Sequence, residues 1–394
     1  MWIDKIKQAA QNIHQQVIVN RRHLHAHPEL SFEEYKTSAF VAQQLTQMNI
    51  QFTKMANTGL VGIIKGELPS DNVIALRADM DALPITETND VPYKSVNTGV
   101  MHACGHDVHT SSLLGTAKIL NDLKSSFGGT IKLIFQPAEE RLPGGANLMI
   151  AEGVLENPKP QAILGQHVMP LIDAGKIGLR SGKYMASTDE IYVTIKGKGG
   201  HGAQPQQNID PVLIMAHMVT ALQQIVSRNA DPRSPSVLSF GKVIANGATN
   251  VIPNEVYLEG TFRTLDEDWR ADAHHKMKTM AKGIVEGMGG KVDFNIVKGY
   301  PYLVNEEKLT ANVKQYAIDY LGAQNVLDLD IWMAAEDFAY FSQATDACFY
   351  RLGTRNEARG ITSSVHTPNF DIDENALNLS TGLMAFLAIK QLGN

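Results

Sequence analysis

The chain has 394 residues, of which 44% are hydrophobic and 19% charged, and its formal net charge at pH 7 is −6. This balance is typical of a globular protein, and the length favours two domains over one. Acidic and basic residues are interspersed, so we expect neither nucleic acid nor a membrane as partner. The N-terminal segment MWIDKIKQAAQNIHQQV predicts an amphipathic helix without the features of a signal peptide. With only two cysteines, a cytoplasmic location is the expectation.

Strands and helices alternate in the first part of the chain. Buried strands are predicted at Val73–Ala78, Thr130–Phe135 and Gln161–Val168, with a helix at His109–Leu123 between the first two. This alternation predicts an α/β fold with a mostly parallel, mixed sheet covered by helices. Ligands of such sheets bind at the carboxyl ends of the strands, where several polar residues of this chain fall.

The pattern changes after residue 185. The predicted order becomes β-α-β-β-α-β, which is that of a ferredoxin-like α+β module. Its elements are Asp189–Lys196, Asp210–Ser227, Ser236–Ile244, Glu255–Thr264, Trp269–Met288 and Lys291–Val297. Helix and strand patterns then return, ending in a helix at Glu374–Gln391. We therefore predict a discontinuous domain of residues 1–185 and 299–394 and an inserted domain of residues 186–298.

The segment GVMHACGHDVHTSS, residues 99–112, concentrates groups that can carry chemistry. Cys104 and His106 are two residues apart, so on an extended segment both side chains project to the same side and can converge on one metal ion. Two alternatives stay open for Cys104. It can be an inert buried thiol, or a nucleophile with His106 or His109 as its base.

Matching ligands occur at three later places in the chain, namely Glu139-Glu140, His167 and His366. Thiolate, imidazole and carboxylate all suit divalent transition metals. Five potential ligands exceed what one catalytic zinc ion needs, which suggests two ions sharing a bridging group. Taken singly, each histidine can equally be a polar residue with an ordinary hydrogen bond.

Two pairs of acids follow predicted strands. In Glu139-Glu140, one carboxylate can bind a metal while the other acts as general base, although a solvated turn would also explain the pair. Asp79 and Asp81 can accept a hydrogen bond from a ligand imidazole and so fix its tautomer, or they can cap a turn.

A series of motifs runs in order along nearly the whole chain. They are RRHLHAHPEL, RADMDALP, MHACGHDVHT, FQPAEE, GQHV, GGHGAQP, GATNVIPNE, GTFRT, AAEDFAYF and VHTPNFDID. Together they resemble the M20 metallopeptidase superfamily. Within it they are most similar to the amidohydrolase branch, which includes N-acyl-amino-acid amidohydrolases, hippurate hydrolases, auxin-conjugate hydrolases and N-acetyldiaminopimelate deacetylases.

The resemblance implies a role for each candidate residue of the discontinuous domain. Glu139 would be the general base of a two-metal centre. The implied metal ligands are Cys104 (bridging the ions), His106, Glu140, His167 and His366. Asp79 stands where the broader superfamily has a histidine ligand, so Asp79 and Asp81 are expected to support ligands rather than to bind metal.

The resemblance also assigns the insert a role as a lid and dimerisation domain. His201 would stabilise the developing oxyanion in the partner subunit's site. Asn250 and Arg263 would bind the substrate's carboxylate. For Arg263, a surface salt bridge with Glu259 is the alternative.

The expected activity is therefore a metal-dependent removal of the acyl group from N-acyl amino acids by a homodimer or tetramer. Zinc or manganese is the expected metal, with cobalt or nickel as further candidates. Three other functions remain open on the sequence alone. They are a dipeptidase or carboxypeptidase with the same metal chemistry, a cysteine hydrolase using Cys104, and a binding protein without catalysis.

Overall fold

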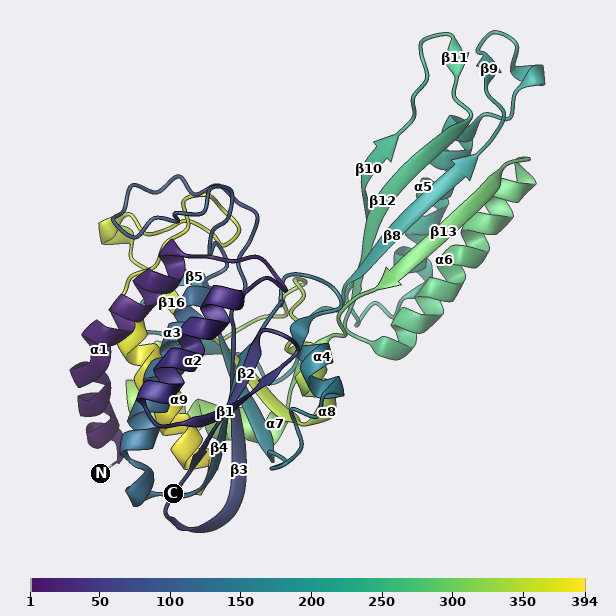
Figure 1. Ribbon diagram of the computed structural model, residues 1–394. Coiled ribbons are helices and arrows are strands. Elements are labelled where there is room, and N and C mark those ends of the chain that lie inside the picture. Colours follow the sequence, from purple (N-terminus) through teal and green to yellow (C-terminus); the bar gives the residue numbers. More distant parts are fainter. Residues whose placement is uncertain (1, 394) are drawn as a thin grey trace. The chain divides into compact units, whose positions relative to one another are not determined.

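The computed structural model describes residues 2–393, so Met1 of the predicted first helix lies outside the described part (Figure 1). The chain divides into two compact units. The discontinuous unit contains the residues up to Lys183, Val304–Ile331 and those from Asp337 onward. The inserted unit contains Tyr184–Leu303 and also Trp332–Glu336, a short segment that the sequence patterns did not associate with the insert.

A mixed eight-stranded sheet forms the centre of the discontinuous unit. Its order is β1 (Gln51–Met55), β2 (Gly59–Lys65), β4 (Gly128–Gln136), β3 (Leu68–Asp79), β5 (Ala162–Asp173), β16 (Asp346–Arg355), β6 (Ile177–Leu179) and β15 (Val326–Asp328). The central strands β4, β3, β5 and β16 pair in parallel. The hairpin of β1 and β2 adds an antiparallel edge that was not among the predicted elements. The predicted mixed α/β fold is confirmed.

Helices cover this sheet (Figure 1). They are α1 (Trp2–Ala26), α2 (Tyr35–Gln47), α3 (His106–Asp122), α4 (Gly145–Ala151), α7 (Glu307–Leu321), α8 (Ala339–Ala344) and α9 (Ala376–Gln391). Helix α3 packs against α1, α9 and β3, so it is buried on nearly all sides. Side chains such as Leu113, Leu120, Leu133, Leu383 and Phe386 form the core between these layers.

The inserted unit is a four-stranded antiparallel sheet with the order β10 (Ser236–Ile244), β12 (Glu255–Thr264), β8 (Asp189–Lys196) and β13 (Lys291–Lys298). Helices α5 (Pro211–Gln224) and α6 (Glu267–Gly287) contribute to the same hydrophobic core. That core takes Ile191, Val193 and Ile195 from β8 because alternate residues of a strand point to one face. The strand order is that of a ferredoxin-like module.

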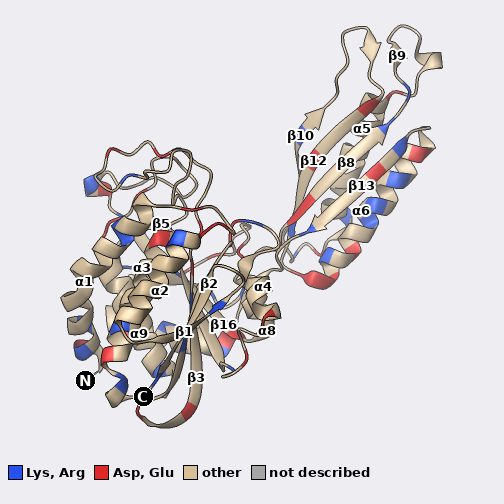
Figure 2. Cartoon of the chain, viewed as in Figure 1, with Lys and Arg blue, Asp and Glu red and all other residues tan. Residues whose placement is uncertain are grey.

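Short elements complete the two units. The strands β9 (Gly200–His201) and β11 (Val251–Ile252) pair at the far end of the insert, and β7 (Gly182–Met185) pairs with β14 (Leu303–Asn305). Helix α6 carries both basic and acidic side chains along its length (Figure 2). Within residues 2–393, no helix is both long and apolar enough to cross a membrane.

Candidate metal centre

The candidate site lies where several strands of the large sheet end. Asp81 follows β3, Glu139 and Glu140 follow β4, and His167 lies on β5. Cys104 comes just before α3, and His106 is the first residue of that helix. Gly105 between them has a φ of +81°, and a Cβ atom there would lie 2.6 Å from the side chain of Val168. Glycine is therefore required for Cys104 and His106 to take these positions.

All five predicted metal ligands meet at this edge of the sheet. The Sγ of Cys104 is 3.4 Å from Nε2 of His167 and 3.2 Å from Nε2 of His366. The Nε2 of His366 is 3.3 Å from Oε1 of Glu140. A backbone bond of 2.8 Å from His366 to the carbonyl of Ala103 brings this distant part of the chain to Cys104.

These side chains form two groups that share one residue. The candidate ligand atoms of Cys104, His106 and His167 lie within 4.8 Å of one another. Those of Cys104, Glu140 and His366 do so as well. A thiolate common to two sets of three ligands has the arrangement of a group that bridges two cations.

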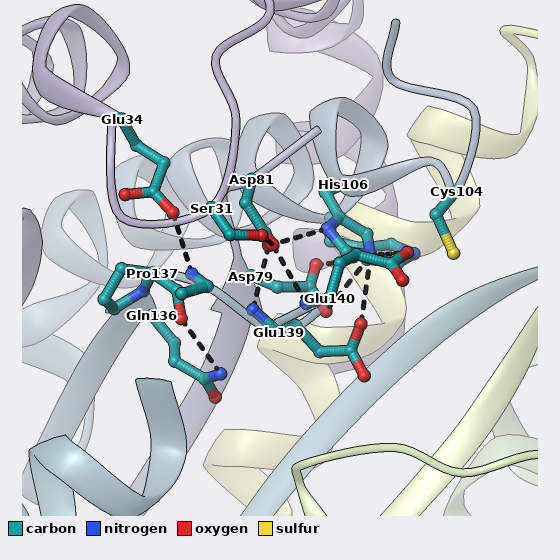
Figure 3. A network of polar contacts seen from close by, with 12 residues as sticks. Ser31, Glu34, Asp79, Asp81, Cys104, His106, Gln136, Pro137, Glu139 and Glu140 are labelled. Atoms are coloured by element: carbon teal, nitrogen blue, oxygen red, sulfur yellow. Dashed lines mark hydrogen bonds and ion pairs between the residues drawn. The ribbon is translucent and has the colours of Figure 1, made fainter. Parts of the chain in front are cut away.

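The chemistry of this donor set fits divalent cations. Nε2 of His106 and Oε1 of Glu140 are buried, and within residues 2–393 they have only ion-pair contacts, of 3.3 Å or more, without the geometry of a hydrogen bond. Buried polar atoms nearly always have a partner, so two such atoms beside a thiol and two further imidazoles are suited to coordination. Figure 3 shows His106, Glu139 and Glu140 gathered on one side of Asp81, with Cys104 next to them.

The electrostatics of the site disfavour Cys104 as a nucleophile. Burial and the nearby carboxylates of Glu140 and Glu139 raise the pKa of its thiol well above the ordinary value. The reactive form of a cysteine nucleophile is the thiolate, which such surroundings suppress. A bound cation would instead stabilise the thiolate, because opposite charges lower the pKa of a thiol.

The two candidate ligand imidazoles, of His106 on α3 and His167 on β5, differ in the charge state that their surroundings favour. Burial alone would lower the pKa of His106, but Asp79 and Asp81 outweigh it and raise that pKa to about 10. Burial and the charge of Arg351 lower the pKa of His167 well below its usual value. The Nδ1 of His167 is 2.8 Å from the carbonyl of Val168, so Nδ1–H donates there and Nε2 faces Cys104 as an acceptor.

Asp81 and Asp79 lie behind the ligands, but they bind different histidines. Asp81 accepts a bond of 3.1 Å from Nδ1 of His106, as expected for a group that orients a ligand. Asp79 accepts its closest imidazole bond, 2.6 Å, from Nδ1 of His109, whereas Nε2 of His106 is 3.8 Å away. Asp79 thus contacts a histidine that is not among the predicted ligands.

Two further residues contact the site: His109, which the sequence offered only as a possible base for Cys104, and Asp337, which it did not indicate. Nε2 of His109 accepts a bond of 2.9 Å from the N–H of Val168, next to His167. Its position three residues after His106 on one helix face was a usable signal. Asp337 accepts bonds from Arg77 and Gln136, and its own N–H lies 3.3 Å from Oε1 of Glu139. It belongs to the AAEDFAYF motif, which by itself did not reveal these contacts.

Glu139 is buried beside the ligands. Its Oε2 lies 3.9 Å from Nε2 of His106. Only about 6% of the residue is exposed, so a solvated turn does not describe the Glu139-Glu140 pair.

The three remaining candidates belong to the inserted unit. His201 on β9 pairs with Val251 on β11, and the N–H of Gly202 donates to the carbonyl of Asn250 at 2.8 Å, so His201 and Asn250 lie at the same end of the insert. Arg263 lies on β12 opposite Val237. Glu259, which the sequence offered as a salt-bridge partner of Arg263, instead accepts a bond of 2.7 Å from Lys242.

A mixed sheet covered by helices, with a cluster of thiol, imidazole and carboxylate groups on and after its strands, is an arrangement expected of a metal-dependent hydrolase. The model of peptidase family M20/M25/M40 matches residues 75–389, and the chain belongs to this family. The resemblance seen in the motifs is thereby confirmed, and with it the prediction of a metal-dependent hydrolase.

Several relatives match over most of their length. An N-acyl-L-amino acid amidohydrolase of Geobacillus stearothermophilus is 44% identical over 78% of this chain and 83% of its own. An N-acetylcysteine deacetylase of Bacillus subtilis is 38% identical over 95% and 97%. Thermostable carboxypeptidase 2 of Saccharolobus solfataricus is also 38% identical, over 98% of both chains.

A solved structure extends the comparison to metal binding. A dinuclear metal-binding peptidase of the M20 family from Bacillus subtilis has a TM-score of 0.82 and 34% identity, over 97% of this chain and 99% of its own. Family membership and this neighbour support divalent metal ions as cofactors.

Proposed function

We propose that the protein removes the acyl group from N-acyl amino acids in a two-metal site. The observation that carries this proposal is the pair of three-residue groups that share Cys104, with the buried Glu139 next to them. The substrate class is supported by the relatives named amidohydrolase and deacetylase. Zinc or manganese is the metal proposed, with cobalt or nickel as further candidates.

In this proposal His106 and His167 would hold one ion, Glu140 and His366 would hold the other, and Cys104 would be available to both. Such ions would lower the pKa of water to about 7 and polarise the amide carbonyl. Glu139 accepts the proton of the attacking water and later donates it to the leaving amine. Asp81 keeps Nδ1 of His106 protonated, so that Nε2 is available for binding.

The insert contributes the substrate contacts. His201 donates a hydrogen bond to the oxyanion of the tetrahedral intermediate, supplied from the partner subunit of a homodimer. Asn250 and Arg263 bind the free carboxylate of the substrate, since a guanidinium can grip a carboxylate with two parallel hydrogen bonds. Residues 186–298 thus act as a lid and dimerisation domain of a cytoplasmic enzyme.

Peptide hydrolysis is a second candidate because thermostable carboxypeptidase 2 of Saccharolobus solfataricus is 38% identical to this chain. A peptide bond and an N-acyl bond are both amides, so the same residues can act on either. The two candidates differ in what lies on the acyl side of the bond.

The deciding experiment is a panel of N-acetyl amino acids, N-benzoyl amino acids and dipeptides, assayed after chelation and re-addition of zinc, manganese, cobalt or nickel. We expect restored hydrolysis of the N-acyl amino acids, with at least tenfold lower kcat/KM for dipeptides. A preference for dipeptides would favour the peptidase. Undiminished hydrolysis by metal-free protein would refute the two-metal site altogether.

A further inference from the structure

Two buried carboxylates bind three successive backbone N–H groups of the segment that carries Glu139 and Glu140 (Figure 3). The N–H of Ala138 donates to Oε1 of Glu34 at 2.8 Å. The next two, of Glu139 and Glu140, donate to Asp81 at 3.1 and 2.9 Å. Asp81 also binds His106, whereas Glu34 reaches this segment from the loop before α2.

Ala138 needs such support because its backbone is strained. Its φ is +49°, in the left-handed region that residues other than glycine adopt at a cost of about 1–3 kcal/mol. The carbonyl of Ala138 accepts a bond of 2.9 Å from the N–H of Gly145. A Cβ atom on Gly145 would lie only 1.7 Å from the carbonyl oxygen of Pro137. The turn is therefore held from two sides, by Glu34 and by the start of α4.

The carboxylate of Glu34 is itself fixed in direction. The residue is fully buried, with an exposed fraction of 0%. Its Oε1 accepts a second bond of 2.9 Å, from the N–H of Phe32, and its Oε2 accepts a bond of 2.7 Å from the hydroxyl of Thr58. Burying a carboxylate costs folding free energy unless its oxygens accept hydrogen bonds. The bonds from Phe32 and Thr58 therefore fix the position of the Glu34 carboxylate that accepts from Ala138.

We propose that Glu34 is a positioning residue for Glu139 and acts through the backbone of Ala138. This inference rests on the proposed role of Glu139 as general base. Glu34 holds the turn so that the carboxylate of Glu139 stays beside the metal ligands, and its own hydrogen bonds go to Phe32, Thr58 and Ala138 rather than to a ligand. Its loss should therefore affect turnover more than metal binding.

Three variants separate positioning from a general structural role. Glu34→Ala removes the acceptor of the Ala138 N–H. Glu34→Gln keeps an amide oxygen for that N–H, while its amide group donates to the hydroxyl of Thr58, which can turn to accept. Glu33→Ala is the matched control, because Glu33 is the exposed neighbour in the same loop.

We expect Glu34→Ala to lower kcat by about 10- to 100-fold, because a displacement of about 1 Å in a catalytic group can cost that much. KM should change less than threefold, and the metal content should equal that of the wild type. Glu34→Gln should restore kcat to within threefold of the wild type, and Glu33→Ala should match it. Unchanged kcat in Glu34→Ala, loss of metal from it, or no rescue by glutamine would each overturn the proposal.

If Glu34→Ala does not fold, Thr58→Val serves instead, because it removes only the hydroxyl that orients Oε2. A fall in kcat of about threefold or more with unchanged metal content is expected, and an unchanged kcat would count against Glu34.

A crystal structure of the variant used gives a readout independent of any substrate. We expect a displaced Glu139 carboxylate, and an undisturbed turn would overturn the proposal even if the proposed function holds. If instead the wild type fails to hydrolyse N-acyl amino acids, it is the proposed function that fails.

Discussion

Glu139 and Glu140 are adjacent in sequence but have different surroundings, as expected if they have the different roles proposed for them. Oε1 of Glu140 faces His366 at 3.3 Å, whereas Oε1 of Glu139 lies 3.3 Å from the N–H of Asp337. Glu139→Gln should preserve the metal content and lower kcat by at least about 100-fold, because an amide cannot accept the proton. Metal analysis and steady-state kinetics measure the two effects.

Glu140→Gln is the matched control, since it is expected to reduce metal binding. The opposite result, in which Glu139→Gln loses metal and Glu140→Gln keeps it, would mean that the roles of the two residues are exchanged.

His201 offers a second test at the level of single residues. It is exposed on β9 and belongs to the inserted unit, apart from the groups of candidate ligands. If it stabilises the oxyanion, His201→Ala should lower kcat by about 10²–10³ while the metal content stays unchanged. His275→Ala, an exposed histidine on α6, should leave turnover as it is. Wild-type turnover in His201→Ala would remove this residue from the mechanism.

The candidate ligands that lie together could be selected from spacing and motifs, but the contacts that support them could not. Cys104 and His106 stand out by their two-residue spacing, and the motifs added Glu140, His167 and His366. The partners of Asp79 were not foreseen, because nothing in RADMDALP indicates that His109 rather than His106 lies closest to it. Likewise, the strained Ala138 and its bond to Glu34 join residues that are 104 positions apart.

Among the elements, the alternating strands of the insert were predicted best. The observed bounds of β8, β10 and β12 equal the predicted ones. In β8 and β12 an alternation between buried and more exposed positions marks the strand, whereas in β10 only Leu238 is buried. Helix α3 begins at His106 instead of His109, since its first turn carries site residues rather than core residues. The hairpin of β1 and β2 lacked a clear alternating pattern and was missed.

The insert contains a buried ion cluster that should respond to acid. Asp189 accepts bonds of 2.6 Å from both Arg270 and His274. Burial alone would raise the pKa of Asp189, but His274 and Arg270 outweigh it and lower that pKa. Its contribution to stability is therefore present above about pH 4, the unfolded value, and is lost as the pH falls through the lower folded value.

Asp189→Asn should destabilise the insert at pH 7 by up to about 3–5 kcal/mol, because it removes the closest charged partner of the buried Arg270 and leaves only Glu267, which is 28% exposed. The stability of the insert should also decrease less below pH 4 in this variant than in the wild type. Hydrogen exchange of the α6 amides, measured at several pH values, tests both effects. Asp272→Asn, which breaks an exposed pair with Lys276, should cost less than about 1 kcal/mol, and equal effects of the two variants would contradict this account.

For the whole molecule, the ligands come from parts of the chain that are far apart, so metal binding should stabilise the complete discontinuous unit. A ligand present at 100 times its dissociation constant stabilises the folded state by about 2.7 kcal/mol. We expect chelation to lower the Tm by several degrees and re-addition of the ion to restore it, as followed by calorimetry. The His366→Ala variant should show a smaller response, and a Tm that is insensitive to chelation would argue against coordination in the folded protein.

The position of β16 between β5 and β6 has a consequence for how the chain matures on the ribosome. Strand β5 has been synthesised before the insert, yet its neighbour β16 and the buried helix α9 emerge only afterwards. Until then β5 is an edge strand of the nascent large sheet, and the apolar surface that α9 later covers is exposed. Nearly all of the insert has been synthesised by that time and can fold. The exposed edge of the sheet therefore needs protection during translation until β16 and α9 have emerged and can pack against it.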